Sequence, residues 1–168
     1  EGGRLAAGHP EHRDDALTAL NNTARELPAG PEKTEVLRLH HQVMIAPLAK
    51  RLRSPRAGEW EAIRVECEQA DSSGLALAGK AECLLERKAG SLFKTELAQA
   101  RTAAFDDRVA AEAGAYGHYV RAIVEEKSER FEAAADEVVV AFSKPEYREW
   151  LQNGRLGRAV SILERALN

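Results

Sequence analysis

The residues that most often catalyse reactions or bind metals are few and scattered in this sequence. Two histidine pairs stand out, His40 with His41 and His9 with His12. Adjacent residues on a helix point about 100° apart, so His40 and His41 do not readily share one metal ion. The spacing of His9 and His12 suits a metal, but Pro10 lies between them. We therefore expect solvated or capping histidines, with no metal and no cofactor.

The richest polar and aromatic cluster lies near residues 112–125. On one helix, Glu112, Tyr116 and Tyr119 share a face, and His118 lies elsewhere on the cylinder. General acid–base catalysis would need a pocket that shifts the pKa of these groups. Half-buried tyrosines with solvated hydroxyls are the ordinary alternative. If the helices stack into an array, these tyrosines become candidates for binding a partner.

Positive charge is concentrated in a connector at about residues 50–57. Such a cluster can bind phosphate or an acidic peptide, and a solvated loop is the alternative. No aromatic residue is interleaved for base stacking, and no nucleic-acid-binding motif follows, so we expect no nucleic acid partner. The possible anion-binding residues are Lys50, Arg51, Arg53 and Arg56.

Motifs of the common enzyme classes are absent from the sequence. It contains no glycine-rich phosphate loop, no nucleophile elbow and no zinc-protease helix. Cys67 and Cys83 are the only cysteines, and their spacing fits no zinc pattern. Two small buried hydrophobes in a reducing compartment are the simplest interpretation, which predicts a cytoplasmic protein. Enzymatic activity has little positive support.

The composition predicts a folded helical chain. Of the 168 residues, 44% are hydrophobic, 30% are charged and 5% are aromatic, and the net charge is −3. A disordered chain would have a lower apolar fraction and a larger net charge. No stretch approaches the ~18 apolar residues that span a membrane, so we expect no membrane partner. Alanine and leucine, both strong helix formers, supply most of the apolar share. We predict one all-helical domain over 1–168.

Prolines, glycines and capping residues divide the chain into expected helices. Pro47 should kink or break the second of them, because proline lacks a backbone donor and clashes with the preceding turn. Ser143 and Glu146 have the spacing of a capping box that opens a short helix. The other helices are expected at residues 13–27, 31–46, 58–70, 75–89, 91–104, 106–126, 131–142 and 155–167.

Several helices share a spacing of large apolar, small and apolar residues in steps of three and four. Phe131, Ala134, Val138 and Ala141 follow this spacing. Such steps keep side chains on one face, and small residues there let a neighbouring helix approach closely. Two further copies begin two residues after a glycine, namely Trp60, Ile63, Cys67 and Ala70 after Gly58, and Leu156, Ala159, Leu163 and Ala166 after Gly154.

The segments GEWEAIRVECEQA, RFEAAADEVVVAFSKP and GRLGRAVSILERAL are the clearest copies. In them the sequence resembles the second helix of the tetratricopeptide repeat family. The resemblance implies antiparallel helical hairpins stacked as a short repeat-like array, with a concave groove that binds peptides or partner helices. A compact helical bundle is the alternative, because alanine-rich amphipathic helices acquire similar spacing by chance.

Two functions follow from these alternatives. The array predicts a protein–protein interaction module, or scaffold, that binds a peptide or helix of another protein in a groove lined by Arg38, His41, Tyr116 and Tyr119. The bundle predicts a helical-bundle enzyme or a small-ligand-binding protein built around the histidines and tyrosines. The oligomeric state stays open.

Overall fold

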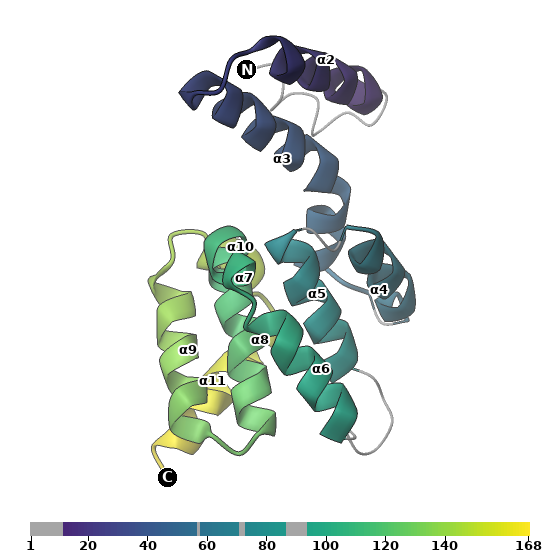
Figure 1. Ribbon diagram of the computed structural model, residues 1–168. Helices are drawn as coiled ribbons and strands as arrows, with labels where there is room; N and C mark the ends of the chain where they lie inside the picture. Colours follow the sequence, from purple (N-terminus) through teal and green to yellow (C-terminus); the bar gives the residue numbers. More distant parts are fainter. Residues whose placement is uncertain (1–11, 57, 71–72, 87–93) are drawn as a thin grey trace. The chain divides into compact units, whose positions relative to one another are not determined.

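The computed structural model describes residues 12–56, 58–70, 73–86 and 94–168 (Figure 1). Within these ranges the regular secondary structure is entirely α-helical, which confirms the all-α class. His9 and the expected helix ends at residues 89 and 91 lie outside the described residues. The helices, with the labels of Figure 1, are α2 (Arg13–Glu26), α3 (Pro31–Arg53), α4 (Trp60–Gln69), α5 (Gly74–Leu85), α6 (Lys94–Ala104), α7 (Asp107–Glu112), α8 (Gly114–Lys127), α9 (Phe131–Ser143), α10 (Tyr147–Trp150) and α11 (Gly154–Ala166).

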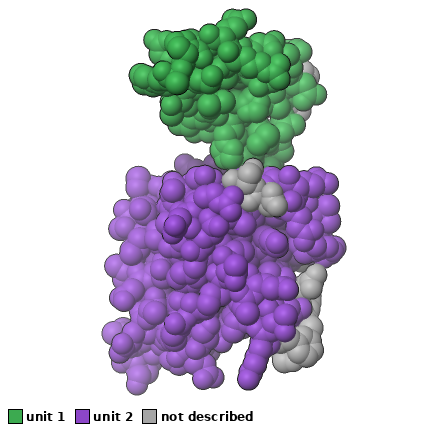
Figure 2. Space-filling model, in the orientation of Figure 1, with its two compact units in different colours: residues 1–51 green, residues 52–168 purple. Residues whose placement is uncertain are grey.

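The chain divides into two compact units, residues 1–51 and residues 52–168 (Figure 2). Compact units and independent folding domains are different properties, so one domain over 1–168 stays a prediction. Among the described helices, none is both long and apolar enough to cross a membrane.

In the first unit, α3 continues through Pro47, so the expected helix end at residue 46 is wrong. Proline has no amide to donate to Val43, the residue four positions earlier. Arg13 of α2 supplies donors instead: its Nε lies 3.3 Å from the Val43 carbonyl oxygen and its Nη2 lies 2.9 Å from that of Met44. Because the orphaned carbonyl has a partner, the helix tolerates the proline.

The expected connector at about residues 50–57 is therefore largely helical. Lys50, Arg51 and Arg53 belong to the last turns of α3. Of the described part of this stretch, only residues 54–56 lie outside a helix before the turn that leads into α4.

In the second unit, α5 lies at the centre and packs against α4, α6, α7 and α8. Helices α8 and α9 lie side by side (Figure 1), and α11 packs against both. Small residues make the closest approaches possible. A Cβ on Gly79 would lie 2.7 Å from the Cys67 sulfur and 3.0 Å from the Leu52 methyl groups. The core thus depends on helices that approach each other closely at glycine and alanine.

The single helix expected over residues 106–126 is two helices, α7 and α8, separated at Ala113. Gly114 begins α8 with a φ of +51°, a conformation that favours glycine. Glu146 lies against this turn, where its Oε1 accepts from the Ala115 amide at 3.0 Å. A Cβ on Gly114 would lie 2.1 Å from the same oxygen.

The capping box expected at Ser143 and Glu146 is consequently wrong. Ser143 is the last residue of α9, and its hydroxyl donates to the Val140 carbonyl oxygen at 2.6 Å. Glu146 caps α8 instead of the short helix α10. The Glu146 carboxylate accepts from a distant amide, that of Ala115, and so does not form the local capping box.

The repeated spacing places its small members in the core. Ala134, Val138 and Ala141 of α9 are fully buried, whereas Phe131 is 37% exposed. This burial fits close helix pairing in a bundle as well as in a repeat. Stacking of the hairpins as a repeat-like array stays a prediction.

Candidate functional site

A buried ion pair joins the end of the chain to its central helix. Arg155 of α11 is 8% exposed and Glu82 of α5 is 2% exposed. Arg155 donates from Nε to Oε1 of Glu82 at 3.0 Å and from Nη2 to Oε2 at 2.7 Å. Its Nη1 donates to the Trp150 carbonyl oxygen at 3.3 Å. Such bidentate geometry fixes the guanidinium firmly.

Tyr116 of α8 also belongs to this network. Its hydroxyl donates to Oε2 of Glu82, and its ring stacks on Trp150 with centroids 4.8 Å apart and planes at 15°. The Arg155 guanidinium carbon lies 4.7 Å from the centroid of the Tyr116 ring. Burial raises the pKa of Tyr116 well above its usual value, and the Glu82 charge adds to the rise. The hydroxyl therefore stays protonated and acts as a donor.

Glu82 and Arg155 of this network line an open pocket of about 610 Å³, which we call the arginine pocket. It is formed by residues 53–56, by α4, α5 and α8, and by the start of α11. The lining includes four arginines, which can bind anionic groups, and two aromatic residues. Its lining consists of Arg53, Ser54, Pro55, Arg56, Trp60, Glu82, Glu86, Tyr119, Gln152, Asn153, Gly154, Arg155 and Arg158.

Arg53 and Arg56 belong to one edge of the pocket. The Arg53 guanidinium lies 5.1 Å from the Trp150 ring centroid and 3.7 Å from an oxygen of Glu149. The Arg56 side chain forms no ion pair with the residues that the structure describes, although its amide donates to Glu59 at 3.3 Å. Arg56 is thus the arginine of the pocket with the least internal compensation of its charge.

Arg158, on α11, shares its carboxylate with another arginine. Its Nη2 lies 3.2 Å from Oε2 of Glu126, and Nη1 of Arg165 lies 3.1 Å from the other oxygen of Glu126. Two guanidinium charges therefore face one carboxylate.

Tyr119 of α8 lines the pocket although it is only 2% exposed. Burial raises its pKa, and the negative charge of Glu82 raises it further. The hydroxyl is therefore protonated and available to donate a hydrogen bond.

The turn into α11 lies at the same pocket. Asn153 has φ +51° and ψ −122°, a conformation that is sparsely populated by residues other than glycine. Strained backbone of this kind is concentrated at binding sites and clamps. Because Asn153 and Gly154 line the pocket, the positive end of the α11 dipole faces it.

The structure brings together three residues that the sequence placed in different candidate sites. Arg53 and Arg56 of the basic stretch line one pocket with Tyr119. Tyr116 is fully buried and is not a lining residue, but its hydroxyl donates to Glu82, which lines the pocket. Lys50 and Arg51 belong to the first unit and are not among the lining residues.

Arg38 and His41 also belong to the first unit. Both Nε and Nη2 of the exposed Arg38 donate to Glu35, at 2.7 and 2.6 Å. The predicted groove residues are therefore divided between the two units.

Sequence reasoning missed Glu82, Arg155 and Trp60 as site residues. A signal for two of them was present. Glu82 lies in the otherwise apolar segment GLALAGKAECLL, and Arg155 precedes Ala159 and Ile162 on the buried face of α11. A charge on an apolar helix face indicates a buried partner of opposite charge.

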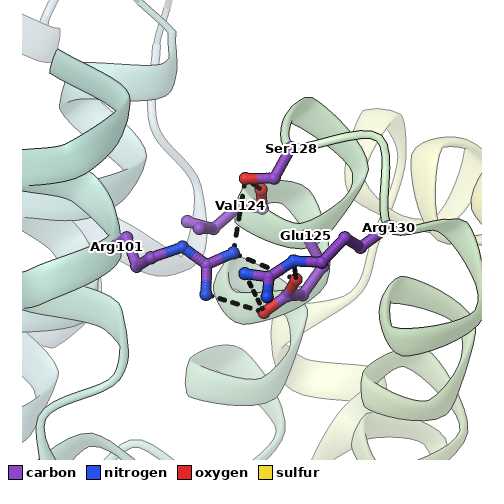
Figure 3. Close-up of polar contacts among 5 residues, drawn as sticks. All are labelled: Arg101, Val124, Glu125, Ser128 and Arg130. Atoms are coloured by element: carbon purple, nitrogen blue, oxygen red, sulfur yellow. Dashed lines mark hydrogen bonds and ion pairs between the residues drawn. The ribbon is translucent and has the colours of Figure 1, made fainter. Parts of the chain in front are cut away.

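A second ion cluster surrounds Glu125 (Figure 3), and none of its residues is among those that line the arginine pocket. Glu125 of α8 receives both guanidinium groups of Arg101 and Arg130, with the closest Arg101 contact at 3.0 Å and the closest Arg130 contact at 2.6 Å. Arg101 also donates to the Ser128 hydroxyl at 3.3 Å. The cluster ties α6 to α8 and to the turn before α9. His118 pairs with Glu137 at 2.6 Å and takes no part in it.

Another open cavity, of about 650 Å³, lies among α4, α5 and α6. Its Arg64 is already bound by Glu61 and Glu68 on its own helix. The lining residues known for this cavity include no aromatic ring. It offers fewer directional contacts to a ligand than the arginine pocket.

Cys67 and Cys83 are free and buried, as expected for small hydrophobes. Burial raises the pKa of the Cys67 thiol to about 12, so it is a poor nucleophile. Across the described ranges, no three histidine, cysteine, aspartate or glutamate side chains come together as a metal site would require.

We compared the chain with known protein families, curated proteins and solved structures. No family model, no curated protein and no solved structure matches the chain.

Proposed function

We propose that this chain is a protein–protein interaction module that binds a segment of another protein in the arginine pocket. The observation that carries the proposal is the convergence of four arginines and two aromatic rings on one open cavity. Tryptophan, tyrosine and arginine are the residues that contribute most to binding energy at protein interfaces.

The pocket is held in shape before any partner arrives. Arg155 is fixed by Glu82, and Arg53 is held between Trp150 and Glu149. A site ordered in advance loses less conformational entropy on binding. Support for a cytoplasmic location comes from the two free cysteines, which suit a reducing compartment.

The pairing of α8 with α9 gives some support to a tetratricopeptide-like array. The two helices pack together, and only residues 128–130 connect them. Short connections of this kind are typical of helical hairpins. The arginine pocket would then be a local feature of the array's surface.

A small-ligand-binding protein is the second candidate, and the volume of the pocket favours it. About 610 Å³ lies within the range of about 300–1,000 Å³ that small-molecule sites occupy. An organic anion with a flat ring would use the same arginines and aromatic residues.

Affinity capture with the intact chain tests the proposal. The Arg56→Ala/Arg158→Ala variant should lose partners that the wild-type chain retains, because both guanidinium groups line the pocket. Arg38→Ala/His41→Ala is the matched control in the first unit and should retain them. Equal capture by both variants contradicts the proposed site. Loss of partners in the control alone would move the site to the first unit.

A further inference from the structure

We propose that the arginine pocket contains a carboxylate subsite formed by the Tyr119 hydroxyl, the first turn of α11 and the Arg158 guanidinium. In the complex, an aspartate or glutamate side chain of the bound segment occupies it. The inference rests on the proposed function, because it specifies the chemistry of the segment that the pocket receives.

Tyr119 supplies the first observation. Its side chain is almost entirely buried, it lines the pocket, and its hydroxyl has no hydrogen-bond partner among the residues that the structure describes. No fully buried polar side-chain atom of the described residues lacks a partner, so the Tyr119 oxygen is open to the pocket, where an incoming group can reach it. Since the phenol stays protonated, the group that completes it is an acceptor.

The start of α11 supplies the second observation. The helix has 13 residues, and no side chain of Asn153 caps it. Within the described chain, the Gly154 amide donates to no backbone or side-chain acceptor, and Gly154 lines the pocket. Unpaired amides at the positive end of a helix dipole favour a negatively charged acceptor.

Arg158 lies one turn further along α11. Burial raises the pKa of Tyr119, and the positive charge of Arg158 is close enough to oppose part of that rise. Arg158 shares Glu126 with Arg165, so part of its charge is uncompensated. A third donor for the same acceptor is therefore present.

The acidic lining residues select the class of anion. Glu82 and Glu86 border the pocket and both act on Tyr119 with negative charge. Arg155 already neutralises Glu82. A second negative charge on the ligand would meet the field of Glu86, so a singly charged carboxylate fits better than a phosphate dianion.

The test uses the full chain labelled with ¹⁵N and three probes: Ac-Ala-Glu-Ala-NH2, Ac-Ala-Gln-Ala-NH2 and inorganic phosphate. The glutamate peptide should shift the Gly154 amide resonance, and the glutamine peptide should bind about tenfold more weakly because it lacks the charge. Phosphate should bind more weakly than the glutamate peptide.

Tyr119→Phe removes one hydroxyl and should weaken binding of the glutamate peptide about tenfold. Tyr147→Phe is the matched control, since the Tyr147 hydroxyl accepts from Arg148 and the residue does not line the pocket. It should leave affinity unchanged. Arg158→Gln is an independent variant that should also bind the glutamate peptide more weakly. It provides the test if Tyr119→Phe does not fold.

Equal binding of the two peptides, tighter binding of phosphate, or unchanged affinity in folded Tyr119→Phe would each overturn the subsite. These outcomes are separable from failure of the proposed function. Suppose that the Arg56→Ala/Arg158→Ala variant loses protein partners but the glutamate peptide does not bind the wild-type chain. The interaction function is then supported and the carboxylate subsite is refuted. Suppose instead that the glutamate peptide binds as expected but the Arg56→Ala/Arg158→Ala variant captures the same partners as the wild-type chain. The subsite is then supported and the proposed interaction function is refuted.

Discussion

Arg13 donates to the carbonyl oxygen of Val43, which in an uninterrupted helix would accept from the residue that is here Pro47. The guanidinium thus replaces the missing amide and also reaches the Met44 carbonyl oxygen. A side chain from α2 thereby allows α3 to continue to Arg53.

Arg13→Ala should expose this defect in α3. We expect a loss of about 1–2 kcal/mol in the free energy of unfolding, because the Val43 carbonyl loses its charged donor. Amide hydrogen exchange should accelerate in the turns around Pro47. In a Pro47→Ala background, the amide of residue 47 can donate to the Val43 carbonyl oxygen. Arg13→Ala should therefore lower the free energy of unfolding markedly less in that background. Equal losses in both backgrounds would show that Arg13 acts through some other contact.

Breaking the buried ion pair between Glu82 and Arg155 should strongly destabilise the second unit. Arg155→Met leaves a buried carboxylate without its cation, and we expect a loss of about 3–5 kcal/mol in urea unfolding. Glu82→Met/Arg155→Met removes both charges and should recover part of that loss. Arg38→Ala is the exposed control, since both Arg38 and its partner Glu35 lie at the surface, where water screens the ion pair and its loss should change the free energy of unfolding little. A double variant less stable than Arg155→Met would contradict a charge-pairing role.

Gly114→Ala should destabilise the chain, because the residue has a φ of +51° and its new Cβ would lie 2.1 Å from Oε1 of Glu146. We expect a loss of at least about 1–2 kcal/mol in urea unfolding. Gly157→Ala in α11 is the matched control, with nothing within 4 Å of the added Cβ. It should stabilise the chain by about 0.5–1 kcal/mol, since alanine is the better helix former. The same sign for both substitutions would be inconsistent with this geometry.

Asp106 should titrate at an unusually low pH. Hydrogen bonds from the Arg108 side chain and amide lower its pKa from 3.8 to about 2. Because the folded-state pKa is the lower one, its stabilising contribution is present above about pH 4 and is lost as the pH falls through about 2. Carboxyl-carbon NMR of the folded chain should give a midpoint near 2, and Arg108→Ala should return it toward 3.8. A wild-type midpoint near 4 would refute the interaction.

The sequence by itself determined the helical class and singled out Arg53, Arg56 and Tyr119, three of the residues that line the arginine pocket. Strong helix formers dominate the composition, and the glycine and proline signals placed most described helix boundaries within a few residues of those observed. Steps of three and four residues also identified buried positions such as Ala134 and Val138. These properties depend on local backbone preference and on which face of one helix is apolar.

Only the tertiary structure decided how helices end and which side chains meet. Pro47 is tolerated because Arg13 comes from another helix, and Glu146 leaves its local motif because the α8 terminus lies beside it. Glu82 and Arg155 meet across 73 residues of sequence. A charge on an apolar helix face indicates that a partner exists but does not identify it, because the favourable energy of these contacts arises only when packing excludes water from both groups.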